Sequence, residues 1–182
     1  NAITGQVPLA GGQVVIGGVD VTGQPPERLV EAGLIRTFQH AQFVPELPMA
    51  DNIAAGAVTR FPRTLGLDSS WPRIRDRQLD TLRAAGLADL LALHPGEVPL
   101  GRRRLAEVVR ALLAHPTVLV LDEPTAGMDE ETLAAFETII GEIAAAGTAV
   151  LLVCHDVPVV KRVSDRVVVM SFGEVLATVD AD

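Results

Sequence analysis

Hydrophobic residues recur along the chain with two spacings, one typical of helices and one typical of buried strands. In the last third, the continuous apolar runs "TVLVLD" and "TAVLLVC" are separated by residues 130–146, where apolar positions recur every three or four residues. A short helix around 157–163 and the run "RVVVMS" follow. Continuous apolar strands that alternate with helices are typical of a parallel sheet covered on both faces. The pattern predicts an α/β fold.

The first two thirds combine a small β region with a helical region. The segment "QVVIGGVDV" at 13–21 has the composition of a hairpin, and "PPERLVEAGL" at 25–34 that of a short helix followed by a strand over 35–38. Residues 49–95 are rich in Ala, Leu and Arg, with helical spacing in "DTLRAAGLADLLALH". A one-face helix, "RRRLAEVVRALLAH", then stops at Pro116. We expect a partial β lobe over 1–48, an inserted helical lobe over 49–100 and the main α/β core over 101–182.

Charge and cysteine content exclude several classes of protein. The 182 residues carry a formal net charge of −8, and the longest basic run is Arg102 to Arg104, so a nucleic-acid partner is not expected. The single Cys154 allows no internal disulfide and fits a reducing compartment; we expect it to be a small buried residue. The apolar runs are strand-sized, well short of the roughly 20 residues that cross a bilayer. A cytoplasmic protein is expected.

Two adjacent carboxylates follow the strand "VLVLD". Ligands of open α/β sheets gather at the carboxyl ends of the strands, and successive strand residues point in opposite directions. One carboxylate of the pair Asp122 and Glu123 can therefore bind Mg²⁺, directly or through water, while the other faces an attacking water.

A histidine follows the next strand of the predicted sheet. Sequential parallel strands usually lie side by side, so His155 should emerge near Glu123 and could donate to a phosphate. Spacing alone favours a structural histidine at a strand end. His40, His94 and His115 show no metal-ligand spacing and are interpreted as structural or surface residues.

Several motifs together resemble one family. The segment "VLVLDEPTAGMD" resembles the Walker B motif and D-loop of ABC-type ATPases, "LLVCHD" their histidine switch and "IRTFQ" their glutamine loop. The order and spacing agree over nearly the whole chain, and "GLIRTFQHAQFVPELPMADNI" looks most like the ATPase subunits of branched-chain amino acid importers. The resemblance implies a P-loop NTPase fold of ABC type, with a parallel core sheet, a small antiparallel β region and an inserted helical lobe.

The resemblance also implies roles for individual residues, with ATP and Mg²⁺ as cofactors. Asp122 would be the magnesium-side carboxylate, Glu123 the general base and His155 the switch that senses the γ-phosphate. Gln39 would reach metal and water and relay to the membrane partner. Asp129 would be the D-loop aspartate at the dimer interface, although it is equally well placed to cap the helix that begins at Glu130.

The family's phosphate-binding loop is missing from the sequence. Such a loop needs closely spaced glycines followed by a lysine and a hydroxyl, but the only lysine is Lys161, with no glycine near it. The opening "NAITGQVPLAGGQV" resembles the stretch that directly follows this loop and its helix in ABC ATPases. We therefore expect an N-terminally truncated chain; a protein that never had the loop is the alternative.

The signature motif also departs from the family's pattern. That motif normally reads Leu-Ser-Gly-Gly-Gln and contacts the γ-phosphate held by the other subunit, whereas the aligned stretch here runs from Val98 to Arg102. Pro99 has neither hydroxyl nor backbone donor. Gly101 keeps one amide, and Arg102 could supply compensating charge or simply be a solvated arginine.

The sequence thus predicts the ATP-binding subunit of an ABC importer for branched-chain amino acids or similar small solutes. It would dimerise with a second ABC ATPase subunit on a membrane permease, at the inner face of the membrane, and be served indirectly by a solute-binding protein. This chain alone would be inactive. The alternatives are a non-hydrolysing structural half of an ABC dimer, favoured by the altered signature, and a soluble ABC ATPase of DNA repair or translation, which no coiled-coil insertion or basic arm supports.

Overall fold

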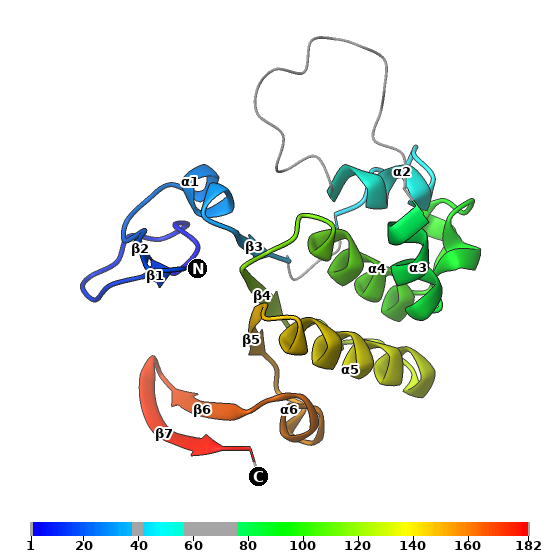
Figure 1. Cartoon of the computed structure of the whole chain (residues 1–182). Coiled ribbons are helices and arrows are strands. Elements are labelled where there is room, and N and C mark those ends of the chain that lie inside the picture. The colour runs from blue at the N-terminus through cyan, green and yellow to red at the C-terminus, as the bar shows by residue number, and fades with distance from the viewer. Residues whose placement is uncertain (1, 38–41, 57–75, 182) are drawn as a thin grey trace, which may run out of the picture.

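The structure is a computed structural model that describes residues 2–37, 42–56 and 76–181. Figure 1 shows a central sheet between a helical layer and an N-terminal β lobe, with the C-terminal hairpin beyond α6. Within the described ranges, no helix has both the length and the apolar character that a membrane span requires.

The central sheet is parallel, as predicted. Its strands are β3 (Leu34–Arg36), β4 (Val118–Asp122) and β5 (Ala149–Val153), in the order β3-β4-β5. The register pairs Arg36 with Val120, and Asp122 with Val153. Helix α5 (Glu130–Ala145) connects β4 to β5. The carboxyl ends of all three strands therefore meet at one edge.

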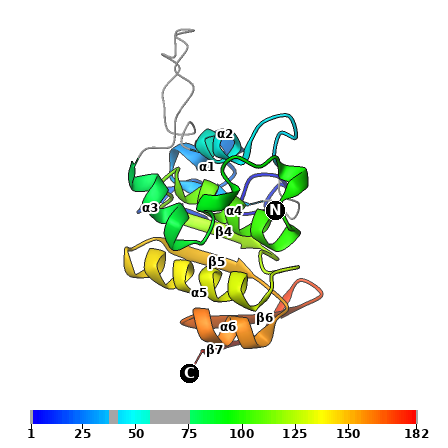
Figure 2. The same cartoon turned by 90° about the vertical axis from the view of Figure 1, so that its right-hand side faces the viewer.

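Two helices cover one face of this sheet. Helix α4 (Leu100–Leu112) and α5 lie along the same side of β4 and β5 in both views (Figures 1 and 2). Their apolar faces, with the inward residues Leu119 and Leu121 of β4, form the main core around the fully buried Phe136. Leu133 and Ile143 of α5, which share the predicted apolar face, pack against this core.

The opposite face is covered only in part. Strands β1 (Val15–Ile16) and β2 (Val19–Asp20) form the predicted hairpin, and with helix α1 (Pro26–Glu31) they build a smaller core that reaches Val120 of β4. The described N-terminal elements cover this face of the sheet at β4 but not at β5, where Leu151 and Val153 are 42% and 49% exposed. The prediction that both faces are covered is wrong for β5, because no described element packs on that side of the strand.

The segment predicted as an inserted lobe is helical in its described residues but more broken than its sequence predicted. It contains α2 (Met49–Ala54), α3 (Asp76–Ala84) and the 3₁₀ turns Ala88–Leu90 and Pro95–Glu97. The helix expected over 80–94 ends at Ala84, because Gly86 adopts φ +65° and turns the chain.

The C-terminal segment forms its own hairpin. After α6 (Val157–Val163), strand β6 (Arg166–Ser171) pairs antiparallel with β7 (Glu174–Asp180). The apolar run "RVVVMS" predicted a strand of the parallel sheet, and β7 was not predicted. Among the described strands β6 pairs only with β7, so that placement is wrong.

Candidate functional site

The predicted carboxylate pair lies at the carboxyl end of β4. Asp122 is the last residue of the strand, and its Oδ2 accepts a hydrogen bond from Arg36 Nη2 at 2.9 Å. Glu123 follows in the left-handed region, at φ +48°. This conformation is uncommon for a non-glycine residue, and strained residues of this kind cluster at functional sites.

Glu123 is held in this conformation from several sides. Its backbone N–H donates to the carbonyl of Val153 at 2.8 Å, which extends the β4–β5 pairing by one residue. Arg104 Nη1, from the first turn of α4, donates to its carbonyl oxygen at 3.2 Å. The fixed backbone aims the carboxylate across the sheet edge, toward the end of β5.

At that end the carboxylate meets the predicted histidine. His155 Nδ1 lies 2.6 Å from Glu123 Oε2. The histidine side chain is 82% exposed and that of Glu123 25%. The sequence-based expectation that these residues share one edge is confirmed in position; their roles are not thereby tested.

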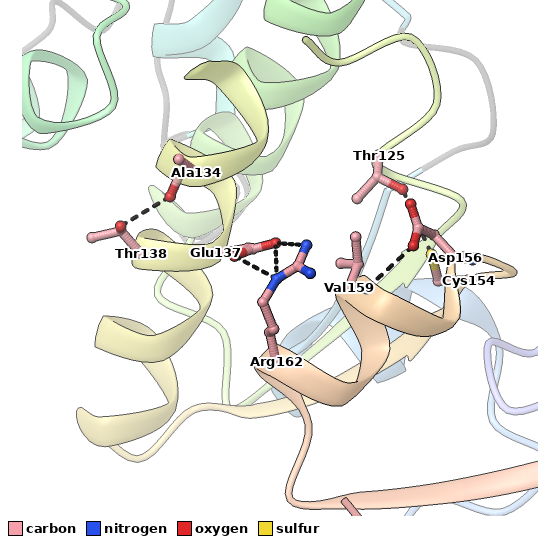
Figure 3. Close-up of polar contacts among 8 residues, drawn as sticks. All are labelled: Thr125, Ala134, Glu137, Thr138, Cys154, Asp156, Val159 and Arg162. Carbon is pink, nitrogen blue, oxygen red and sulfur yellow. Dashed lines mark hydrogen bonds and ion pairs between the residues drawn. The ribbon is translucent and has the colours of Figure 1, made fainter. Parts of the chain in front are cut away.

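Helix α6 and its neighbours fix the segment that carries His155. Figure 3 shows Asp156, whose Oδ1 accepts the Val159 N–H and so caps α6. Arg162 at the other end of α6 forms a two-pronged ion pair with Glu137 of α5, at 2.7 to 3.1 Å. Cys154 is half-buried, less than predicted, and its Sγ lies 3.6 Å from Thr125 Oγ1.

The residues predicted to form the D-loop and the signature motif lie against each other. Asp129 caps α5, its Oδ1 accepting the Thr132 N–H at 2.8 Å, and hydrogen bonding from Thr132 holds the pKa of Asp129 below its usual value. Gly101 packs directly on the D-loop: a Cβ there would lie 2.7 Å from Met128 Cα and closer still to the Gly127 carbonyl. Gly101 thus has a packing role within this chain.

Arg102 is engaged inside the chain. Its guanidinium grips Asp89 with two hydrogen bonds of 2.7 and 2.9 Å and also donates to the Gly86 carbonyl. This pairing lowers the pKa of Asp89 and raises that of Arg102. The geometry supports a structural role for Arg102, which links α4 to the segment of Gly86 and Asp89. Pro99 stands at the N-cap of α4 and makes no side-chain cap.

Two other predicted features bear on the cofactors. Gln39 lies outside the described residues. Lys161 sits in the last turn of α6, far in sequence from any glycine-rich loop. The described residues contain no group of three His, Cys, Asp or Glu side chains that could hold a metal ion. Because Mg²⁺ in nucleotide sites usually takes only one or two protein carboxylates and completes its shell with phosphates and water, the single Asp122 fits such a metal.

Sequence reasoning missed Arg36 and Arg104. Both contact the carboxylate pair, Arg36 through the Asp122 side chain and Arg104 through the Glu123 carbonyl. The available signal was the position of Arg36 at the end of a strand beside the one that carries Asp122.

Comparisons with known proteins agree with this geometry. The model of the ABC transporter family matches residues 1–126. A methionine import ATP-binding protein, MetN 1 from Pseudomonas savastanoi pv. phaseolicola, is 31% identical over 92% of this chain and 49% of its own length. The branched-chain amino acid transport ATP-binding protein LivG from Escherichia coli is 26% identical over 97% of this chain and 73% of its own. The chain thus spans about half the length of MetN.

Solved structures show the same fold. A nucleotide-free ATP-binding cassette from an ABC transporter superposes with a TM-score of 0.81 at 26% identity, covering 100% of this chain and 74% of the other. The ADP conformation of the cassette MJ1267 also gives 0.81, at 27% identity. Because the family model matches residues 1–126, more than half of the chain, the chain belongs to the ABC transporter family.

Proposed function

We propose that this chain is part of the ATP-binding subunit of an ABC transporter that hydrolyses ATP to drive solute transport. The observation that carries the proposal is the 2.6 Å contact between His155 Nδ1 and Glu123 Oε2. Glu123 directly follows Asp122, and the contact lies at the carboxyl edge of the parallel sheet. A metal-side carboxylate, a second carboxylate and a phosphate-facing donor are the parts that hydrolysis of a phosphoanhydride needs.

Each residue would have a separate task. When bound, ATP would supply the phosphoryl group, and Mg²⁺ would neutralise the charge that develops on the phosphate oxygens during hydrolysis. Asp122 would hold the metal, directly or through water. Glu123 would orient the attacking water, with its carboxylate fixed by the strained backbone and by His155. His155 would contact the γ-phosphate through Nε2, which can donate a hydrogen bond when the ring is protonated.

The phosphate-binding loop is proposed to lie outside these 182 residues, since Lys161 is the only lysine. The complete protein would dimerise with a second ABC ATPase subunit and couple to a membrane permease on the cytoplasmic side. The solute is proposed to be a branched-chain amino acid or a similar small solute. The similarity to LivG over 97% of this chain supports this choice, and the similarity to a methionine importer supports amino acids more broadly.

A second candidate function is a non-hydrolysing structural half of an ABC dimer. Pro99 favours it, because a proline at the start of α4 can offer neither a hydroxyl nor a backbone N–H to the partner's nucleotide. The intact contact between Glu123 and His155 favours hydrolysis.

The test is ATP hydrolysis by the complete cassette with Glu123→Gln. The substitution keeps the shape but removes the base, so the rate should fall by about a hundredfold or more while ATP remains bound and stabilises the dimer. Glu131→Gln, in the first turn of α5, is the matched control and should hydrolyse at the parental rate. A Glu123→Gln cassette as active as its parent would refute the assignment of the base, and a parental cassette without activity would favour the structural half.

A further inference from the structure

Arg36 is the cation that holds the metal-side carboxylate. It ends β3, in register with Val120, and Asp122 lies two residues further along β4 on the same face. The Arg36 Nη2 atom donates to Asp122 Oδ2 at 2.9 Å. The side chains are only 14% and 29% exposed, so this ion pair is less screened by water than a surface pair.

The guanidinium of Arg36 also forms hydrogen bonds with residues 4 and 6 of the N-terminal segment. Its other terminal nitrogen, Nη1, donates to Gln6 Oε1 at 2.8 Å and to Thr4 Oγ1 at 3.2 Å. Thr4 is buried, at 7% exposure. One planar fork therefore joins residues 4–6 to the end of β4, a geometry that a lysine could not reproduce.

Mg²⁺ and Arg36 would compete for the same carboxylate. A divalent cation at Asp122 would stand next to the guanidinium charge, and two cations on one carboxylate repel each other. Mg²⁺ also demands near-ideal octahedral geometry, which a carboxylate fixed by an arginine fork cannot freely satisfy. A metal bound directly at Asp122 Oδ2 would therefore weaken the link between Arg36 and Asp122.

We propose that Arg36 is a positioning residue that holds Asp122 in the metal-free protein and releases it when Mg²⁺ binds with nucleotide. Release of Asp122 also loosens the grip of Arg36 on Thr4 and Gln6, so that metal binding is transmitted to the segment 2–7. Arg36 additionally lies three positions before Gln39, the predicted glutamine-loop residue. This inference rests on the proposed function, because it assigns Asp122 to the metal.

The first test is Mn²⁺ binding by the complete cassette in the presence of ADP, measured by electron paramagnetic resonance. Arg36→Met removes the competing cation, so Mn²⁺ should bind about three- to tenfold more tightly, while the metal-free protein melts at a lower temperature. The matched control Arg28→Met breaks an exposed ion pair with Glu31 on α1 and should bind Mn²⁺ like the parent.

The result that overturns the inference is an Arg36→Met cassette whose Mn²⁺ affinity is unchanged or weaker. Weaker binding would mean that Arg36 only supports the shape of the site. If the parental ADP complex takes up no Mn²⁺ at all, the metal assignment of Asp122 itself fails, and the proposed function fails with it. The two failures are therefore distinguishable.

A second variant separates the effect of the positive charge from the effect of the bridging hydrogen bonds. It also keeps the inference testable if Arg36→Met does not fold. Arg36→Lys keeps a cation beside Asp122 but cannot bridge to Thr4 and Gln6 at the same time. We expect near-parental Mn²⁺ affinity together with faster hydrogen exchange of amides 2–7. In the parent, addition of Mn²⁺ and ADP should speed exchange in the same segment. Two results would overturn the coupling between metal binding and the segment 2–7. One is a parental protein whose amide hydrogen exchange does not change when Mn²⁺ and ADP are added. The other is an Arg36→Lys variant that binds Mn²⁺ as tightly as Arg36→Met does.

Discussion

His155 Nδ1 lies 2.6 Å from Glu123 Oε2, within hydrogen-bonding distance. An ionised carboxylate only accepts hydrogen bonds, so with Glu123 ionised the ring nitrogen is the donor. The histidine side chain is 82% exposed, so Nε2 is left open to solvent and to a ligand. The contact thus orients the ring and steadies the carboxylate at the same time.

The first prediction concerns this contact. In the complete cassette, His155→Ala should lower ATP hydrolysis by about 10²- to 10⁴-fold, because both the phosphate donor and the support of Glu123 are lost. ATP binding should persist, since the substitution removes only one of the proposed contacts with the nucleotide. Single-turnover hydrolysis and equilibrium ATP binding measure the two effects. Parental turnover at saturating ATP would show that the contact is structural.

The second prediction concerns this chain by itself. The 182-residue chain should bind ATP weakly or not at all, because its only lysine, Lys161, lies on α6 away from any glycine-rich loop. Calorimetry with Mg²⁺ and ATP measures this directly. Micromolar affinity would show that these residues build a phosphate site of another kind.

The third prediction concerns Pro99 at the start of α4. In the complete dimer, Pro99→Ser should raise hydrolysis several-fold at the site formed with the partner's phosphate-binding loop. A hydrogen bond to charged phosphate contributes about 1.5–3 kcal/mol, and the lower end is expected in a site that has adapted to proline. Pro99→Ala is the control, because it restores the backbone N–H without the hydroxyl. Equal rates for Ser and Ala would show that the hydroxyl is not what the site lacks.

The fourth prediction concerns the close approach of Gly101 to the D-loop. Gly101→Ala should destabilise the chain by about 1–3 kcal/mol, because the added methyl group must push Gly127 and Met128 away from α4. Gly141→Ala, on an exposed turn of α5 with no neighbour within 4 Å, should instead stabilise by about 0.5–1 kcal/mol. Urea unfolding of both variants measures the difference. A neutral Gly101→Ala variant would contradict the packing role.

The core of the fold could be predicted from the sequence because its signals are local and strong. Strands β4 and β5 are continuous apolar runs, and α5 carries its apolar residues on one face between a capping aspartate and Gly147. The rule that sequential parallel strands are neighbours then placed His155 beside Glu123. Their proximity is confirmed, while the roles of both residues remain predictions.

The features that were not predicted depend on contacts between residues distant in sequence, or on strands that are exposed to solvent. The run "RVVVMS" reads equally well as a buried parallel strand or as one arm of a hairpin, and the turn at Phe172 and Gly173, both at positive φ, decides for the hairpin. Arg102 was expected to supply charge at the signature motif or to be a solvated arginine, but it pairs with Asp89, 13 positions away. No periodicity of the sequence encodes such a pairing.

The ion pair between Arg36 and Asp122 can form only some time after Arg36 has been synthesised, because Asp122 comes much later in the chain. The two residues are 86 positions apart. At about 5–20 residues per second, a ribosome needs roughly 4–17 s to deliver the second after the first. During that interval β3 lacks β4, its partner among the described strands, and the guanidinium lacks Asp122, whereas α2 and α3 are already being made from neighbouring residues. The sheet edge that carries the proposed chemistry is therefore among the last parts of the chain to assemble.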